Sequence, residues 1–227
     1  MSRCADFNSW PSGSVSYTDH GAGANLNIIT SLSIDAWVKF KQGGQNVRAA
    51  IFIRSVPGVG GYYLTIYRNH IPGKNTLTFT RMTIVEHDSD VDIVNGTPVH
   101  IAITYNLTTG DTIFYRNGVA VQTMNNMGGI VSAGVINSYI NANAAGSGFN
   151  GCVYSLNVYN RVLSLAEINY NMQHPADAIR RGRQLGVTQE SWQGGVWKDL
   201  SPNAYDGTPT GVVLSPNNNI AGRCVLI

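Results

Sequence analysis

Apolar and polar residues alternate along much of the chain, which is the pattern of strands with one packed and one wetter face. The clearest run lies over residues 32–40. Its packed side consists of Leu32, Ile34, Ala36, Val38 and Phe40, and its other side of Ser33, Asp35, Trp37 and Lys39. The signal returns at the spacing of antiparallel sheets over 47–55, 62–68, 76–85, 99–105 and 112–116. The pattern therefore predicts an all-β protein.

A tight turn is predicted where Asn117-Gly118 separates two short apolar runs, 113–115 and 119–121. Both residues tolerate the positive φ angles of a two-residue hairpin whose twist matches that of its strands. We expect a β-hairpin at this point.

Helix signals occur only late in the chain. Ser164 lies three residues before Glu167, so its hydroxyl can cap the first free helical N–H groups while the carboxylate reaches back to the Ser164 amide. This predicts a short helix over 164–173. A second helix is predicted over 175–185, because Pro175 suits a first helical position and Gly186 a stop.

Size and composition narrow the possibilities further. A chain of 227 residues is long enough for one large all-β domain spanning 1–227. A net charge of +2 with 12% charged residues gives no strong field, so nucleic acid is not expected as a partner. No apolar run reaches about 18 residues and positions 1–30 lack the zones of a signal peptide, so we expect no membrane insertion.

Several segments together resemble the laminin G-like domains of the concanavalin A-like jelly-roll family. They are Asn-Gly-Cys-Val at 150–153, Tyr-Asn-Arg-Val-Leu-Ser at 159–164, Ser-Leu-Ser-Ile-Asp-Ala-Trp-Val-Lys-Phe at 31–40, Val-His-Ile-Ala-Ile-Thr-Tyr-Asn at 99–106 and Tyr-Arg-Asn-Gly at 115–118. The resemblance covers most of residues 15–173. It implies an antiparallel β-sandwich jelly roll with one or two short C-terminal helices, in a family whose members mostly bind and do not catalyse.

The end of the chain resembles the beginning of such domains. Residues 198–208 look like the segment that usually opens them, and 221–227 like the strand that ordinarily runs on into 15–17. This implies a circularly permuted order, with 174–196 as a helical or irregular connector; alternatively, 197–227 completes a neighbouring subunit's sheet. Permutation would bring Cys4 near Cys224, which could form a disulfide in an oxidising setting.

The acidic cluster Glu86, Asp88, Asp90 and Asp92 supplies hard oxygen donors that could hold Ca²⁺. The alternative is a solvated loop whose charges deter edge pairing. Retaining β-glucanases of this fold carry Glu-x-Asp-x-Glu along one strand, with the catalytic carboxyls facing the cleft. Here Asp90 stands where the last Glu is expected and is shorter by one methylene, so glycoside hydrolysis is a remote alternative and we expect no enzyme.

Aromatic and arginine side chains on consecutive predicted strands could stack on and hydrogen-bond a sugar or another protein. The candidates are Tyr63, Tyr67, Arg68 and Arg81. The alternative is that they fill the core, since about half of an alternating set must point inward.

These features favour a non-catalytic virion structural protein, such as a capsid decoration, minor capsid or tail or fibre protein, because such a protein reaches the exterior without a secretion signal. Its partners would be copies of itself, capsid or tail proteins, or glycans, and its location the virion surface. The alternative is a free-standing carbohydrate-binding module or lectin that works outside the cell.

Overall fold

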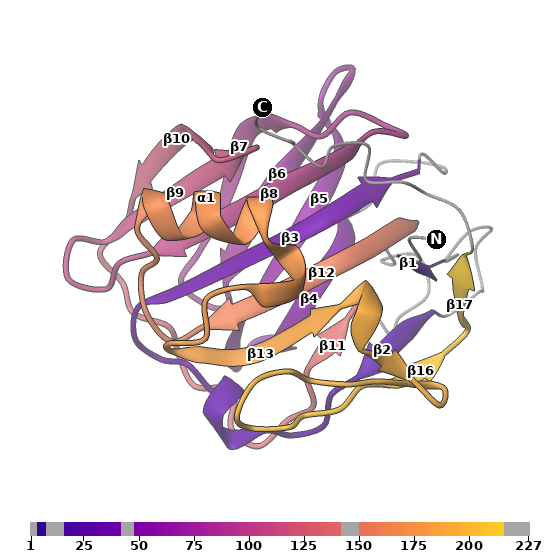
Figure 1. Ribbon diagram of the computed structural model, residues 1–227. Coiled ribbons are helices and arrows are strands. Elements are labelled where there is room, and N and C mark those ends of the chain that lie inside the picture. The colour runs from indigo at the N-terminus through magenta and orange to yellow at the C-terminus, as the bar shows by residue number, and fades with distance from the viewer. Residues whose placement is uncertain (1–3, 8–15, 42–47, 142–149, 216–227) are drawn as a thin grey trace.

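The computed structural model describes residues 4–7, 16–41, 48–141 and 150–215, and these form two antiparallel sheets packed face to face (Figure 1). Sheet A has the order β10 (Val119–Asn125), β9 (Asp111–Arg116), β8 (Pro98–Tyr105), β3 (Leu32–Phe40), β12 (Gly151–Tyr159), β1 (Cys4–Phe7) and β17 (Val212–Ser215). The edge of β12 that carries β1 also pairs with β13 (Arg183–Thr188). The antiparallel β-sandwich expected from the sequence is therefore confirmed.

Sheet B carries the remaining long strands. Its order is β16 (Thr208–Thr210), β2 (Tyr17–Asp19), β11 (Tyr139–Ile140), β4 (Arg48–Val56), β5 (Gly60–Ile71), β6 (Lys74–Arg81) and β7 (Val85–Asp92). A small ribbon, β14 (Trp192–Gln193) with β15 (Val196–Trp197), completes the described strands. The described residues also form three 3-10 turns, η1 (Ala24–Leu26), η2 (Pro175–Asp177) and η3 (Gln189–Ser191), and one α-helix.

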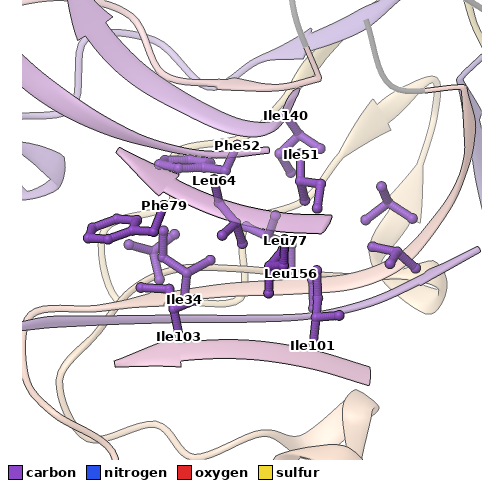
Figure 2. Packing of buried hydrophobic residues seen from close by; sticks show 14 of the residues in the cluster. Ile34, Ile51, Phe52, Leu64, Leu77, Phe79, Ile101, Ile103, Ile140 and Leu156 are labelled. Atoms are coloured by element: carbon purple, nitrogen blue, oxygen red, sulfur yellow. The ribbon is translucent and has the colours of Figure 1, made fainter. Parts of the chain in front are cut away.

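The core lies between the two sheets and is built from the inward half of each alternating strand. Ile34, Ile101, Ile103 and Leu156 of sheet A meet Ile51, Leu64, Leu77 and Phe79 of sheet B (Figure 2). Removing each such side chain from water contributes about 1.5–3 kcal/mol, which makes this interface the main source of stability.

The hairpin and the first helix are confirmed in detail. Asn117 and Gly118 have φ angles of 50° and 74° between β9 and β10. Helix α1 (Leu165–Gln173) starts at Ser164, whose hydroxyl accepts the Glu167 N–H at 3.3 Å while Glu167 accepts the Ser164 N–H at 2.9 Å. Hydrogen bonds from the Arg161 guanidinium lower the pKa of Glu167 to about 2.

Helix α1 covers the outer face of sheet A (Figure 1). The Trp37 indole donates to the carbonyl of Met172 at 2.9 Å, and the amide of Asn171 donates to the buried Asp35 at 2.8 Å. The outer face of sheet B carries no helix among the described residues. None of the helices in the described ranges is long and apolar enough to span a bilayer.

The second predicted helix is wrong. Residues 175–185 give only the turn η2 and the start of β13, and Gly182, with φ at 76°, separates the two. Leu185 and Val187 lie two residues apart and both reach the core, while their backbone hydrogen-bonds the edge of β12. Strand pairing and burial therefore override the local helix signals in this part of the chain.

The predicted division of residues 76–92 into one strand and a loop is also wrong. Strand β6 ends at Arg81, a turn places Thr83 at φ 69°, and β7 then takes up 85–92. His87, Ser89 and Val91 face inward along β7 and are buried. Because two of these inward residues are polar, the hydrophobic alternation that marks a strand is missing.

The C-terminal segment lies beside strands from the beginning of the chain. Strand β16 pairs with β2, and β17 pairs with β1 (Figure 1). This is the neighbourhood that the permutation hypothesis requires; both permutation and exchange with a neighbour stay predictions. Cys224 lies outside the described residues, so its pairing with Cys4 also stays a prediction.

Candidate functional site

A cleft of about 610 Å³ opens at the edge of sheet B, between β2, β16 and the turn 199–207. It is lined by Tyr17, Asp19, His20, Gly21, Ala204, Tyr205, Asp206, Thr208 and Thr210. The lining comes from two stretches of chain almost 200 residues apart, which the pairing of β16 with β2 brings together.

Strand alternation places Tyr17 and Asp19 on the same outward face of β2, while Thr18 between them is buried. In the register with β16, Asp19 lies opposite Thr208 and Tyr17 opposite Thr210. The Tyr17 ring packs edge-on against Tyr139 of β11, with centroids 5.5 Å apart and an interplanar angle of 89°. This contact orients the Tyr17 ring before any ligand arrives.

The Asp19 carboxylate is oriented by neutral donors on both oxygens. Oδ1 accepts the Gly21 N–H at 2.8 Å, and Oδ2 accepts the side-chain amide of Asn137 at 2.8 Å. Because an ionised carboxylate offers about four acceptor positions, Asp19 is both held in place and able to accept further hydrogen bonds.

The turn 199–207 is organised by Asp199, which is 8% exposed. Its Oδ1 accepts the N–H groups of Gly186 and Ser201, both at 2.8 Å. Its Oδ2 accepts the Ser201 hydroxyl at 2.6 Å and the Tyr205 N–H at 2.8 Å. One buried carboxylate thereby ties the turn to β13 and fixes where Tyr205 enters the cleft.

Asp206 is the second carboxylate of the cleft. It accepts the Lys198 ammonium at 2.6 Å and the Asp199 N–H at 3.0 Å. The hydrogen bond from Lys198 lowers the pKa of Asp206, so this carboxyl is ionised at neutral pH.

The Tyr205 ring is seated on the turn that contains η1. A Cβ atom at Gly23 would lie 2.5 Å from the ring, so only glycine allows this approach. The Tyr205 hydroxyl accepts the Asn25 N–H at 3.4 Å. The ring of Tyr205, the second tyrosine among the lining residues, is thus positioned by the backbone of 23–25.

His20 forms the buried back of the cleft and is 2% exposed. Its Nδ1 lies 2.7 Å from the carbonyl of Tyr205, and since a carbonyl only accepts, Nδ1 carries the proton. Nε2 then accepts the Thr18 hydroxyl at 3.1 Å. Burial lowers the pKa of His20 despite the nearby Asp199, Asp19 and Asp206, so the imidazole is neutral at pH 7.

We expect thermal stability to fall as the pH drops below about 6.5, the ordinary pKa of histidine, because the folded chain needs His20 neutral and its folded-state pKa is lowered. The stability that neutral His20 contributes is fully present above pH 6.5 and decreases as the pH falls from 6.5 to the lowered pKa of the folded state. Melting curves between pH 7 and 5 should show a smaller loss in His20→Gln than in the wild type. Burial also lowers the pKa of His87, which therefore adds a similar pH dependence to both proteins. The difference between the two proteins gives the contribution of His20. Identical slopes in the two proteins would contradict the prediction.

The contact residues predicted from the sequence lie elsewhere. Tyr63 and Tyr67 are half-buried on the outer face of β5, where the Arg48 guanidinium lies 5.0 Å from the Tyr67 ring centroid and 3.4 Å from the Tyr63 hydroxyl. The side chain of Arg68 lies outside the described residues. Neither Tyr63 nor Tyr67 lines the cleft.

The assignment of Arg81 to a contact surface is wrong, because it is 1% exposed. Its guanidinium lies 4.3 Å from the ring centroid of Tyr105 in the core and donates to the carbonyl of Asn126 at 3.0 Å. As the last residue of β6, Arg81 holds the 126–129 segment against the sandwich.

Three of the four acidic residues of β7 are already engaged by neighbouring groups. Glu86 forms an ion pair with Arg48, Asp88 accepts the Thr78 hydroxyl at 2.7 Å, and Asp92 accepts the Asn75 N–H at 3.1 Å. Asp90 is exposed. Within the described ranges no three His, Cys, Asp or Glu side chains are grouped as metal ligands. The geometry therefore gives no support to a calcium site here, and calcium binding stays a prediction.

The residues that line the cleft were not predicted as a site from the sequence. The one signal that pointed toward them was the likeness of 198–208 and 221–227 to segments that precede 15–17 in related domains, which implied a circularly permuted order. Strand β2 is three residues long, which is too short for its side chains to form a pattern from which a site could be predicted.

Comparisons with known proteins agree with the fold. The laminin G family model described as the concanavalin A-like lectin/glucanases superfamily matches residues 12–169. A search of curated proteins finds no match to the sequence.

Among solved structures, a protein from Bacteroides ovatus proposed to bind carbohydrate is 18% identical, with a TM-score of 0.71 over 95% of this chain. The chain spans 60% of that protein. The heptameric SAP-like pentraxin of Limulus polyphemus is 14% identical, with a TM-score of 0.64 over 94% of both chains. The sialyllactose-bound module of the Ruminococcus gnavus IT-sialidase is 13% identical, with a TM-score of 0.53 over 70% of this chain and 94% of the module. At these identities the likeness concerns the fold alone.

Proposed function

Because the chain belongs to the concanavalin A-like lectin/glucanases superfamily, we propose that it is a non-catalytic carbohydrate-binding protein that holds a glycan in the cleft between β2 and the turn 199–207. The observation that carries the proposal is the lining of this cleft, in which two tyrosines, Tyr17 and Tyr205, and two aspartates, Asp19 and Asp206, come together. The Bacteroides ovatus and Ruminococcus gnavus proteins lend support, since both have this fold and are described as glycan-binding.

The lining suits the chemistry of a sugar. A sugar ring has apolar C–H patches that pack on aromatic faces, and hydroxyl groups that need acceptors and donors. Tyr17 and Tyr205 offer the aromatic surfaces, Asp19 and Asp206 accept O–H groups, and the hydroxyls of Thr208 and Thr210 both donate and accept. Few well-placed polar groups in a concave site are what orients a small ligand.

The same geometry favours binding over hydrolysis. Hydrolysis of a glycosidic bond needs a carboxyl that carries a proton at the working pH. Asp206 is paired with Lys198 and its pKa is lowered, so it is ionised. On β7, Glu86 of the predicted glucanase-like motif is paired with Arg48.

A glycan array followed by titration calorimetry of the bound sugars tests the proposal. We expect Tyr17→Ala to weaken binding at least tenfold, equivalent to about 1.4 kcal/mol, because the aromatic wall is removed. Tyr17→Phe should bind almost normally, since the ring and its packing on Tyr139 are kept.

Tyr63→Ala is the matched control, because it removes a half-buried tyrosine from the same sheet outside the cleft. We expect it to leave affinity unchanged, and we expect EDTA to have no effect. Loss of binding in Tyr63→Ala but not in Tyr17→Ala would move the site to the residues predicted from the sequence. No bound glycan of any class would overturn the proposal.

The virion structural role, with copies of the chain or capsid and tail proteins as partners and the virion surface as its location, stays a prediction from the sequence. It is compatible with a glycan-binding cleft, because a particle surface is one setting in which such a site would act.

A further inference from the structure

We infer that the cleft selects glycans by charge, binding amine-bearing sugars more tightly than neutral ones and rejecting acidic ones. This inference rests on the proposed function, and it concerns the ligand class of that same site. Its starting point is the charge on the wall of the cleft, where Asp19 and Asp206 supply two carboxylates and none of the described lining residues is a lysine or arginine.

The two carboxylates are not equivalent. Asp206 is neutralised by the Lys198 ammonium at 2.6 Å. Asp19 accepts only the neutral donors Gly21 N–H and Asn137 Nδ2, and across the described part of the chain it forms no ion pair. The cleft therefore contains one carboxylate without a cationic partner, already oriented by two hydrogen bonds and able to accept more.

Among the described residues, Arg54 interacts electrostatically with Tyr205 of the cleft, but its charge is committed elsewhere. Arg54 is 1% exposed, and its guanidinium donates to the Ile136 carbonyl at 2.6 Å, the Gly134 carbonyl at 3.1 Å and the Ser138 hydroxyl at 3.0 Å. His20 is held neutral with its proton on Nδ1 against the Tyr205 carbonyl. Neither group presents positive charge to a ligand at neutral pH.

The aromatic wall adds to the preference. An ammonium group close to Asp19 also lies beside the Tyr17 ring, two residues away on the same face of β2. Aromatic faces attract cations and repel anions through the ring quadrupole. A carboxylate or sulfate on the sugar would meet Asp19 with like charge and gain nothing from the rings.

The cleft is open to water, and this limits the difference in affinity that its charge can produce. A solvent-exposed ion pair contributes about 0.2–1 kcal/mol, which corresponds to an affinity ratio of up to about fivefold between an amine and its neutral parent. The acidic form should be weaker than the neutral parent by a similar ratio. Raising the salt concentration should shrink both ratios, because exposed charges are screened within about 10 Å at 0.1 M ionic strength.

The experiment uses three sets of monosaccharides that differ mainly in charge. The glucose set contains glucosamine, glucose and glucuronic acid, and the galactose and mannose sets contain the corresponding three forms. Each sugar is titrated by ligand-observed NMR at low and high salt. Asp19→Asn removes the charge, and the amide of Asn137 can turn to present its oxygen, so the fold is retained. Asp90→Asn is the matched control, since it makes the same change on exposed Asp90 of β7, at the opposite edge of sheet B.

Tightest binding of the amine in each set that binds, lost in Asp19→Asn and kept in Asp90→Asn, supports the inference. Binding of the neutral members with equal or better binding of the acids overturns the charge preference and leaves the proposed function standing. An amine preference that survives Asp19→Asn also overturns it, because the charge then acts from elsewhere. Absence of any binding, here and on the glycan array, overturns both.

Discussion

Replacing Asp199 with alanine is expected to lower the free energy of unfolding by about 4 kcal/mol and to abolish glycan binding, because four donors lose one shared acceptor. Each buried donor left without a partner costs about 1–3 kcal/mol, and the serine hydroxyl recovers part of this by rotating. Binding is lost with stability, since Asp199 positions the turn that carries Tyr205 and Asp206. Urea denaturation and calorimetric titration measure the two effects.

Two variants give this prediction its controls. Asp199→Asn keeps one oxygen acceptor and should lose roughly half as much stability as the alanine variant. Asp177→Ala removes an aspartate that is 64% exposed and paired only with Arg180 on the surface, so we expect a change below about 0.5 kcal/mol. If Asp199→Ala proved as stable as Asp177→Ala, the hydrogen bonds of Asp199 would not organise the turn.

Replacing Trp197 with alanine is expected to cost about 3–5 kcal/mol, the usual loss when a large aromatic side chain is removed from a core. Trp197 is 0% exposed and packs near Phe7 of β1 and Trp192 of β14, with centroids 6.4 Å and 5.8 Å away. Its indole also donates to the carbonyl of Thr188 at 2.7 Å. The mutation should therefore loosen the attachment of 198–215 as well as the core.

The controls again come from the chain itself. Trp197→Phe keeps most of the packed volume and should lose less than half as much, and Trp192→Ala removes a half-buried indole and should cost about 1–2 kcal/mol.

Denaturation midpoints of all variants are compared at several protein concentrations. A wild-type midpoint that rises with concentration would indicate that the C-terminal segment completes a neighbouring subunit. A midpoint independent of concentration is the result expected from β16 and β17 pairing within the chain.

Short sequence patterns were sufficient to predict three elements of the fold, namely strand β3, the hairpin between β9 and β10, and the start of α1. Strand β3 alternates cleanly because one side faces the core, and Asn117-Gly118 closes a hairpin because both residues accept positive φ. Ser164 and Glu167 cap α1 because the two groups lie one helical turn apart. In each case the cause lies within a few residues of the effect.

The errors occurred where tertiary context outweighed local preference. Residues 183–188 became a strand because the edge of β12 was open to pairing and the core could take Leu185 and Val187. Strand β7 was missed because His87 and Ser89 are buried in place of apolar residues. Arg81 was taken for a contact residue because nothing in its sequence neighbours reveals that Tyr105 and Asn126 enclose it.

The sequence by itself determined the class of fold, the family, the Asn117-Gly118 hairpin and the start of α1, since strand periodicity, turn preference and capping are short-range properties of neighbouring residues. The tertiary structure alone decided the cleft, because Tyr17 and Asp19 meet Tyr205 and Asp206 only after β16 pairs with β2. It also decided how Asp19 is held, since the Asn137 amide that donates to it comes from a part of the chain 118 residues away.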